Sequence, residues 1–347
     1  MMKPIIKLFI LLLVLNSCKT KQEEQIEVNS EDTIESDLVI AFGSCNRQNV
    51  ENRLWDDVLA NDPSYWIWGG DVIYSDTDDM VLMAEHYAIQ LAQNGYDQIR
   101  TQTKIHGTWD DHDYGLNDGG LEYVAKAESQ QLFLDFLGVP VDSERRKREG
   151  VYYSEKISSE NGSVNLIVLD TRYFRTALTT SNDPDKRYEP NPIGEGTLLG
   201  DAQWSWLEDE LNNSEADFNL IMSSIQVLSH EHGYETWGNM PHEVDKLKNM
   251  ILSSKAKGVI ILSGDRHISE FSKTSIEGLD YPLIDFTSSG MTHSYSSFEG
   301  EPNEFRHGEV ISDLSFGLLK FNFKTKTVVM EMRGENNLVQ QGLIQIY

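Results

Sequence analysis

The chain has 347 residues with 39% hydrophobic and 24% charged side chains, which is enough for a sizeable core in one or two domains. Its 56 Asp and Glu residues against 29 Lys and Arg residues give a net charge of −27. We therefore expect no nucleic-acid-binding surface, because this field repels polyanions at long range. An anionic substrate would need local cations. Most of the excess acidity is explained equally well as an adaptation for solubility that has no bearing on the chemistry.

The first 18 residues, MMKPIIKLFILLLVLNSC, have the form of a signal peptide. Lys3 and Lys7 precede an apolar run at 8–15. This run is too short for a permanent membrane-spanning helix, which needs about 20 apolar residues.

The end of that segment, 15-LNSC-18, resembles a bacterial lipobox, which implies that Cys18 is lipidated. An ordinary secretory signal with an incidental cysteine is the alternative. Residues 19–37 carry many charges and scattered apolar side chains, a composition typical of a flexible tether. We therefore expect a lipid-anchored protein of the cell envelope, in the periplasm or at the cell surface.

The chain from residue 38 onward repeats a strand–helix–strand pattern, in which continuous apolar runs alternate with helical spacing. The predicted elements are a strand at 38–42, a helix at 50–60, a second strand in the apolar run 65–74, which Gly69 and Gly70 interrupt just before Asp71, a helix near 80–97 and a strand at 104–109. Three successive strand ends thus deliver Cys45, Asp71 and the run 110-DDHD-113.

The later elements mix parallel and antiparallel character. They are a strand at 163–172, a helix at 201–214 with Asp201 as its N-cap, a strand at 218–226, a helix at 241–254 opening on Pro241, a strand at 257–267, and a hairpin of 314–323 with 326–332. The pattern predicts an α/β fold of two packed mixed β-sheets flanked by helices. We expect residues 38–347 to form a single domain.

The run 110-DDHD-113 concentrates charge at a strand end. In a solvated loop such a run needs no purpose, because carboxylates in water repel each other weakly. Trp109 and Tyr114 flank it, however, which favours a partly buried loop. There the carboxylates would repel strongly and some would protonate, unless a bound cation neutralised them.

Several residues with metal-binding side chains follow strands that could share one sheet edge, where ligands bind in open α/β sheets. They are Cys45, Asp71, Tyr74, Asp110, Asp111, His112, Asp113, Asp265 and His267. Each alone is more often structural, since strand-end aspartates commonly form turns. Their recurrence together predicts a metal site.

Cys45 has no disulfide partner if Cys18 carries lipid, because the chain has 2 cysteines. A free cysteine is usually a small buried core residue. The aspartates and His267 that accompany it argue for a different role.

The ordered motifs 43-GSC-45, 70-GDVIY-74, 110-DDHD-113 and 264-GDRH-267 resemble those of the PhoD-like alkaline phosphatases and phosphodiesterases. This family belongs to the calcineurin-like metallophosphoesterase superfamily. The similarity runs from about residue 38 to the C-terminus. It includes 169-LDTRYF-174, 203-QWSWLEDEL-211 and 287-TSSGMTH-293.

The resemblance implies roles for individual residues. Asp71 would bridge two metals, and Cys45, Tyr74 and His267 would complete a first site that holds ferric iron. Asp111 and Asp265 would serve a second site.

His112 would lie beside the leaving-group oxygen. Aspartates in place of histidine and asparagine favour Ca²⁺, Mg²⁺ or Fe³⁺ over Zn²⁺, and a thiolate with a phenolate suits ferric iron. We expect Fe³⁺ and Ca²⁺ as cofactors.

Other polar residues have weaker signals. Arg172 and Arg175 follow a strand and could clamp phosphate oxygens, or they could simply solvate the strand end. Ser224, Gln226 or His230 could fill the second metal site, where the segment 223-SSIQVLSH-230 departs from the superfamily pattern and leaves one ligand unassigned.

These observations predict a metal-dependent phosphoester hydrolase, in which metal-activated water attacks phosphorus. A non-catalytic calcium-binding surface lipoprotein is the alternative, although calcium alone gives no reason for Cys45 and His267. The preference between monoesters and diesters, the natural substrate and the oligomeric state stay open.

Overall fold

The computed structural model describes residues 35–347. The predicted signal peptide, Cys18 and most of the predicted tether at 19–37 lie outside the described residues. Within the part of the chain that is described, every helix is too short or too polar to cross a membrane.

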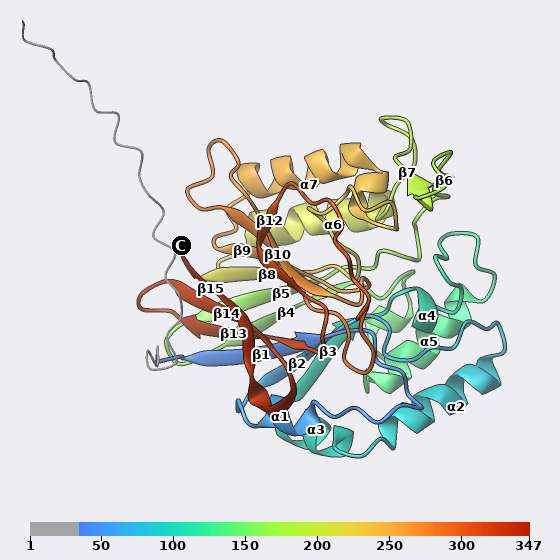
Figure 1. Cartoon of the computed structure of the whole chain (residues 1–347), viewed down its shortest axis with the longest axis horizontal. Coiled ribbons are helices and arrows are strands. Elements are labelled where there is room, and N and C mark those ends of the chain that lie inside the picture. Colours follow the sequence, from blue (N-terminus) through green and yellow to red (C-terminus); the bar gives the residue numbers. More distant parts are fainter. Residues whose placement is uncertain (1–34) are drawn as a thin grey trace, which may run out of the picture.

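Two mixed β-sheets pack face to face at the centre of the molecule (Figure 1). The six-stranded sheet has the order β15-β14-β13-β1-β2-β3, in which β1, β2 and β3 run parallel. Its strands are β1 Leu38–Gly43, β2 Tyr65–Gly69, β3 Lys104–Thr108, β13 Phe316–Asn322, β14 Thr327–Arg333 and β15 Val339–Ile346.

The seven-stranded sheet has the order β12-β10-β11-β9-β8-β5-β4, with β11, β9, β8 and β5 parallel. Its strands are β4 Tyr153–Ser158, β5 Ser163–Val168, β8 Phe218–Met222, β9 Val259–Ser263, β10 Ser269–Thr274, β11 Leu283–Thr287 and β12 Arg306–Ile311. A two-stranded ribbon, β6 Thr179–Thr180 with β7 Tyr188–Glu189, projects separately.

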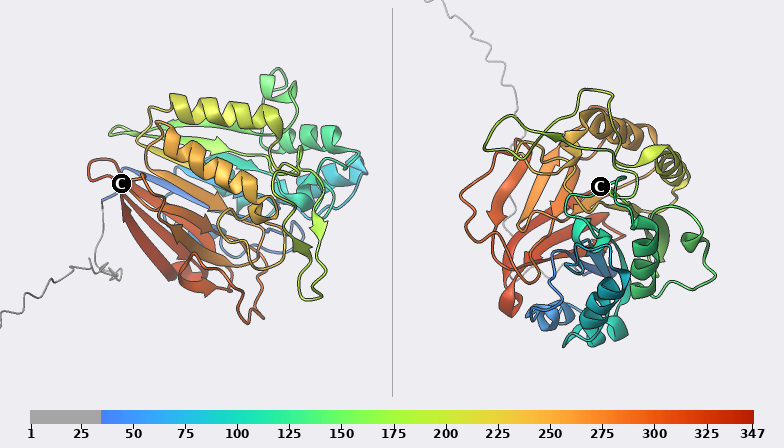
Figure 2. Two further views of the ribbon diagram at one scale, coloured as in Figure 1. Left: turned by 90° about the horizontal axis from the view of Figure 1, so that it is seen from above. Right: turned by 90° about the vertical axis from the view of Figure 1, so that its right-hand side faces the viewer.

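Helices cover the outer face of each sheet, so that the chain forms four layers (Figures 1 and 2). The helices beside the six-stranded sheet are α1 Trp55–Leu59, α2 Met80–Leu91, α3 Tyr96–Gln102 and α5 Lys126–Phe136. Those beside the seven-stranded sheet are α6 Gly200–Asn213 and α7 Pro241–Ser253. The short elements are α4 Asp111–Tyr114, η1 Glu144–Arg146, η2 Trp237–Asn239 and η3 Glu335–Asn337.

The alternation of side chains along the strands separates a core cluster between the two sheets from clusters on their outer faces. Ile40 and Phe42 point between the sheets, toward Leu220 and Phe286 of the other sheet. Ala41, Trp66 and Trp68 point outward, where aromatic side chains of α1, α3 and α5 cover them. The predicted fold, two packed mixed sheets flanked by helices, is confirmed.

Several predicted element boundaries are wrong. Leu199, not Asp201, occupies the N-cap position of α6, so the expected Asp201 cap does not form. The helix expected near 80–97 is two helices, because Gly95 adopts a left-handed conformation between them. The helix expected at 50–60 is reduced to α1. The antiparallel hairpin of β13 and β14 is confirmed.

Candidate metal centre

The candidate centre lies where the carboxyl ends of β1, β2, β3 and β9 approach one another. Three overlapping groups of metal-binding side chains occur there, each with its ligand atoms within 4.8 Å of one another. The groups are Cys45 with Asp71 and His267, Asp71 with Asp111 and His112, and Asp110 with Asp111 and Asp265. Asp71 and Asp111 each belong to two groups, which is the arrangement that two neighbouring cations require of a shared ligand.

The backbone at this centre is strained. Ten non-glycine residues among those described have positive φ, and six of them lie in or beside the centre: Cys45, Asp71, Asp76, Asp118, Asp265 and His267. This conformation costs about 1–3 kcal/mol per residue and concentrates at functional sites. The fold therefore holds these side chains in place at a cost in stability.

Three buried carboxylate oxygens at the centre have no hydrogen-bond partner in the described structure: Asp71 Oδ1, Asp110 Oδ2 and Asp111 Oδ1. An unpartnered buried carboxylate oxygen is costly, and a cation is the usual remedy. Oxygen, thiolate and imidazole donors together fit one hard cation and one that also accepts nitrogen and sulfur ligands. The donor set thus fits the two metals that the sequence implies.

The protonation of these groups supports the same conclusion. Burial, together with the neighbouring carboxylates, raises the pKa of Asp71 and Asp110 well above the usual range, and raises that of Asp265 to about 7. Burial also opposes ionisation of Asp111, but Arg172 and His112 outweigh it and lower the pKa of Asp111. Without a cation, these carboxylates cannot all be ionised at neutral pH.

The thiol and the phenol lie beside the same aspartate. Cys45 Sγ is 3.4 Å from Asp71 Oδ2, and Tyr74 Oη is 3.1 Å from Asp71 Oδ2 and 3.1 Å from His267 Nε2. Burial raises the pKa of Cys45 and of Tyr74, so neither ionises readily without a metal. Ser289 Oγ donates to Cys45 Sγ at 3.0 Å. Cys45 therefore lies within one donor group with Asp71 and His267.

His112 faces the pocket above this cluster. Its Nδ1 lies 2.8 Å from Asp76 Oδ2, which leaves Nε2 available to a ligand. Burial would lower the pKa of His112, but Asp71, Asp76 and Asp111 raise it to about 10. His112 is therefore an imidazolium at neutral pH in the metal-free protein.

Arg172 does not occupy the position expected of a phosphate clamp. The side chain is 0% exposed and forms buried ion pairs with Asp110 and Glu235. Arg175 is also buried and pairs with Glu235 at 2.9 Å. Their charges are already engaged by carboxylates, so they support the centre from beneath.

The three candidates for the unassigned ligand lie apart from one another. Ser224 Oγ donates to Asp110 Oδ1 at 2.8 Å. Gln226 Nε2 donates to Glu270 and Thr287, away from the three donor groups. His230 is partly exposed beside Glu304. Ser224 is the candidate that contacts the centre.

The structure adds residues that the sequence did not single out, namely Asp76, Glu235 and Ser289. Asp76 and Glu235 come from loops without a motif of their own, whereas Ser289 lies in 287-TSSGMTH-293, just after β11, where no role was assigned to it. Asp113, expected to support the site, does so through the backbone: its carboxylate accepts hydrogen bonds from Asp71 N, Val72 N and Asp110 N.

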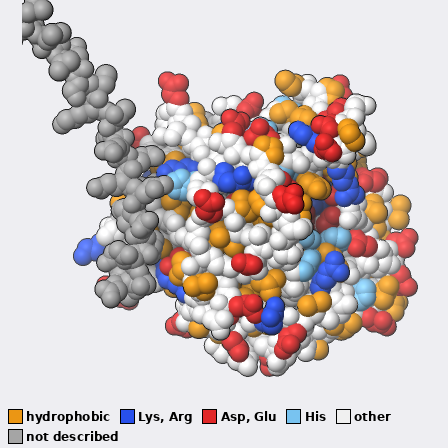
Figure 3. Space-filling view, in the orientation of Figure 1, with side chains coloured by type: hydrophobic (Ala, Val, Ile, Leu, Met, Phe, Trp, Pro, Cys, Tyr) orange, Lys and Arg blue, Asp and Glu red, His pale blue; other side chains and the backbone are white. Residues whose placement is uncertain are grey.

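The centre opens into a pocket of about 400 Å³. Asp71, Asp111, His112, Asp265 and His267 lie among its lining residues, and Arg187, Tyr234 and Tyr295 belong to the lining outside the donor groups. Figure 3 shows histidines grouped with Lys and Arg side chains near the position of α4, whereas acidic side chains are scattered over this face. Among the residues that line the pocket, Arg187, Arg266 and the protonated His112 carry positive charge, which an anionic substrate would need, whereas burial lowers the pKa of His267 to about 4 and keeps it neutral.

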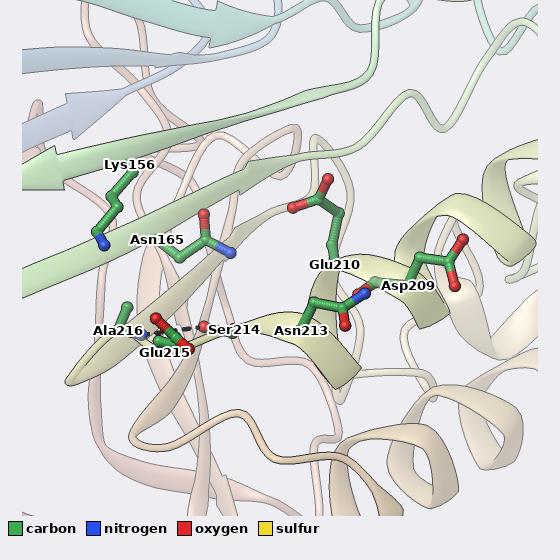
Figure 4. A pocket seen from close by; sticks show the side chains of 8 residues that line it. All are labelled: Lys156, Asn165, Asp209, Glu210, Asn213, Ser214, Glu215 and Ala216. Carbon is green, nitrogen blue, oxygen red and sulfur yellow. Dashed lines mark hydrogen bonds between the residues drawn. The ribbon is translucent and has the colours of Figure 1, made fainter.

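A separate hollow of about 240 Å³ lies beside the C-terminal end of α6 and the β4–β5 edge (Figure 4). Its lining includes Lys156, Asn165 and three acidic side chains of the α6 end and the following turn. It contains none of the donor residues and is not part of the centre.

The two packed sheets and the donor groups at their strand ends define a metallophosphoesterase-like fold. The chain belongs to the PhoD-like phosphatase family, whose sequence profile matches residues 40–288. It is 26% identical to alkaline phosphatase D of Bacillus subtilis (strain 168) over an alignment of 245 residues, and the match covers 60% of this chain and 41% of that protein. The match thus spans less than half of this relative's length.

Two solved structures share the fold. PhoD superposes with a TM-score of 0.69 at 16% identity, covering 89% of this chain and 68% of its own. A dimetal phosphatase from Danio rerio gives a TM-score of 0.54 at 15% identity, covering 90% of this chain and 100% of its own.

Proposed function

We propose that this protein is a metal-dependent phosphoester hydrolase of the alkaline phosphatase or phosphodiesterase type. The observation that carries the proposal is the set of three overlapping donor groups that share Asp71 and Asp111 and contain unpartnered carboxylate oxygens. Family membership supports a phosphate ester as the substrate.

The donor chemistry assigns two positions. Cys45, Asp71, Tyr74 and His267 would hold ferric iron, because a thiolate, a phenolate and an imidazole suit that ion. Asp71, Asp111 and Asp265 would hold Ca²⁺, which prefers carboxylate oxygens. When bound, such cations lower the pKa of water and neutralise the charge that develops on the phosphoryl oxygens.

The chain's own residues perform the remaining work. Asp76 holds His112 through Nδ1, so that Nε2 can donate a proton to the leaving-group oxygen. Arg172 pairs with Asp110, and Glu235 in turn pairs with Arg172. Asp113 connects the loop after β2 to the loop after β3 through hydrogen bonds, which fixes the relative positions of the metal-binding side chains on both loops.

Elemental analysis combined with hydrolysis of aryl phosphate monoesters and diesters tests this proposal. We expect iron with calcium in the wild type, and loss of iron and of turnover in Cys45→Ala. Val168→Ala is the matched control, because Val168 is fully buried in the core between the sheets and lies outside the donor groups.

Retention of iron and activity in Cys45→Ala would show that Cys45 is a packing residue. Absence of turnover in the fully metallated wild type would refute the hydrolase and leave a calcium-binding protein. The ratio of diester to monoester hydrolysis will indicate the substrate class.

We also propose that the protein is a cell-envelope lipoprotein anchored through Cys18. The support is the sequence alone: a basic start, a short apolar run and 15-LNSC-18. Metabolic labelling with an alkyne fatty acid should modify the full chain and not Cys18→Ala. Unchanged labelling of the variant would contradict the anchor.

A further inference from the structure

A cavity of about 350 Å³ lies at the open edge of the sandwich. Its walls come from β3 and β4, which are the outermost strands of the two sheets, together with η1 and α6. None of the candidate metal ligands belongs to its lining. The cavity is therefore a separate feature of the molecule.

Two arginines enter this cavity, each stacked on an aromatic ring. Arg145 Cζ lies 3.6 Å from the ring centroid of Tyr153, and Arg148 Cζ lies 4.0 Å from that of Tyr152. The rings cover the faces of the guanidinium groups, and Trp206 packs against Tyr152 with centroids 4.8 Å apart. Stacking of this kind leaves the N–H groups at the edges of the guanidinium plane to find acceptors of their own.

Those acceptors are missing in the described structure. Arg145 Nε, Arg145 Nη2 and Arg148 Nε are buried without a hydrogen-bond partner. Within residues 35–347, neither arginine forms an ion pair, although the protein has a net charge of −27. An unpartnered buried donor on a charged group is costly, and arginine does not lose its proton in proteins.

The nearby carboxylates do not supply the missing partner. Glu144 pairs with Lys147 at 2.6 Å, and Glu155 lines the cavity but does not form an ion pair with either arginine. Burial lowers the pKa of Arg145 and of Arg148, and it outweighs the opposite effect of the carboxylates around them, Glu155 for Arg145 and Glu210 for Arg148.

The loop that carries both arginines is fixed from beneath by α5. Gln130, which is buried, donates from Nε2 to Arg145 O at 3.3 Å and to Arg148 O at 2.8 Å. Its Oε1 accepts from Gly150 N at 3.0 Å. On the other side, Tyr153 Oη lies 3.0 Å from His106 Nδ1 of β3. The cavity is thus built in advance of any ligand.

We propose that this cavity binds a tetrahedral oxyanion, phosphate or sulfate, free or carried on a larger molecule. The oxygens would accept hydrogen bonds from the unpartnered N–H groups of Arg145 and Arg148. The inference does not depend on the proposed hydrolase activity, because the two sites share no residue.

Isothermal titration of the full chain with sodium sulfate, against sodium chloride at equal ionic strength, tests the site. Sulfate is suitable because a phosphoesterase does not consume it. We expect saturable binding by the wild type, weakened about tenfold or more in Arg145→Gln and in Arg148→Gln. Arg53→Gln is the matched control, since Arg53 is exposed, carries the same charge and pairs with Glu335 elsewhere.

The variants separate the possible results. Arg145→Lys keeps the charge but loses the planar fork, so weak binding by it supports hydrogen-bonded recognition over simple charge attraction. Sulfate binding at the metal centre would persist in both glutamine variants. Equal binding by all variants, or no saturable binding by the folded wild type, would overturn the proposal.

A second titration compares inorganic sulfate with a monosaccharide sulfate. Trp206 lines the cavity and is partly exposed, so a sugar ring could stack on it. Tighter binding of the sugar sulfate, reduced in Trp206→Ala, would show that the cavity binds an oxyanion attached to a larger molecule. Equal binding would identify the free ion.

Discussion

The run 110-DDHD-113 divides its charge among distinct tasks. Asp113 is structural, because its carboxylate accepts backbone hydrogen bonds from both neighbouring loops. Asp110 is paired with Arg172, and Asp111 and His112 face the pocket. Carboxylates in the same short run thus have different environments, and burial raises the pKa of Asp113 to about 8. The charged residues of this run therefore have different functions, which explains why so many of them occur together.

Substitution of Asp76 tests the role assigned to His112. Asp76→Asn removes a carboxylate that raises the pKa of His112, so this pKa should fall from about 10. A proton donor must be protonated to act, so the alkaline limb of the pH–rate profile should move to lower pH. Histidine NMR titration of the metal-depleted protein measures the pKa directly.

Asp78→Asn is the control for this experiment, since Asp78 is an exposed neighbour that has no hydrogen bond to His112. An identical pH profile for Asp76→Asn and the wild type would remove His112 from the role of proton donor.

Glu235 tests the buried charge cluster beneath the centre. It pairs with Arg172 and Arg175, and all three side chains are buried. Glu235→Gln should destabilise the protein by about 3 kcal/mol, because it leaves two buried cations with one fewer partner. Urea denaturation measures the change.

Glu304→Gln serves as the comparison, because Glu304 is exposed and 3.7 Å from His230, where an ion pair contributes about 0–1 kcal/mol. Equal losses of unfolding free energy in the two variants would mean that the buried ion pairs of Glu235 contribute no more than the exposed pair of Glu304.

The sequence predicted most of the site residues that follow strands, and missed Asp76 and Glu235, which do not. Asp71 and Asp265 follow apolar runs that predict strands, so their convergence could be expected. Asp76 and Glu235 lie in loops whose paths depend on tertiary packing. Arg172 follows a strand as well, yet its direction toward the interior could not be read from its position.

At the scale of single elements, the turns after the strands matter more than the strands themselves. Gly70 has φ +99°, and a Cβ atom there would lie 2.5 Å from Asp110 Cβ. The turn after β2 and the turn after β3 therefore touch through a position that only glycine fits. Helix boundaries were predicted less well, since Gly95 interrupts a helical pattern that otherwise continues.

Gly70→Ala should therefore destabilise the protein by about 3 kcal/mol or more, through both backbone strain and the clash with Asp110. Gly138→Ala isolates the strain component, because Gly138 also has positive φ (+68°) but a Cβ atom added there would have nothing within 4 Å. We expect about 1 kcal/mol for that variant. Equal destabilisation of the two variants, measured by urea denaturation, would show that the clash with Asp110 adds no cost beyond the backbone strain. Metal content should fall in Gly70→Ala alone.

At the scale of the whole molecule, the protein combines a net charge of −27 with several acidic groups in its interior. Asp113 and Asp265 have folded-state pKa values raised to about 8 and about 7 from 3.8. At these two carboxyls the folded metal-free protein therefore binds more protons than the unfolded chain between about pH 4 and pH 8. The stability that these two groups contribute must fall as the pH rises through this range, while buried histidines such as His106 and His267, whose pKa burial lowers to about 4, act in the opposite direction below about pH 6.5.

His112 acts in the same direction at higher pH. Its folded-state pKa of about 10 lies above the ordinary histidine value of 6.5, so its contribution to stability is fully present below about pH 6.5 and is lost as the pH rises through about 10.

The chelator-treated protein should accordingly lose about 5 °C or more in Tm between pH 5 and pH 9. Bound cations favour the ionised carboxylates, so the metallated protein should show a much smaller fall over the same range. Differential scanning calorimetry of both forms measures the two slopes. A chelated protein that is equally or more stable at pH 9 would mean that these carboxyls ionise without a cation, and the principal electrostatic reason for a metal at this edge of the sheets would be lost.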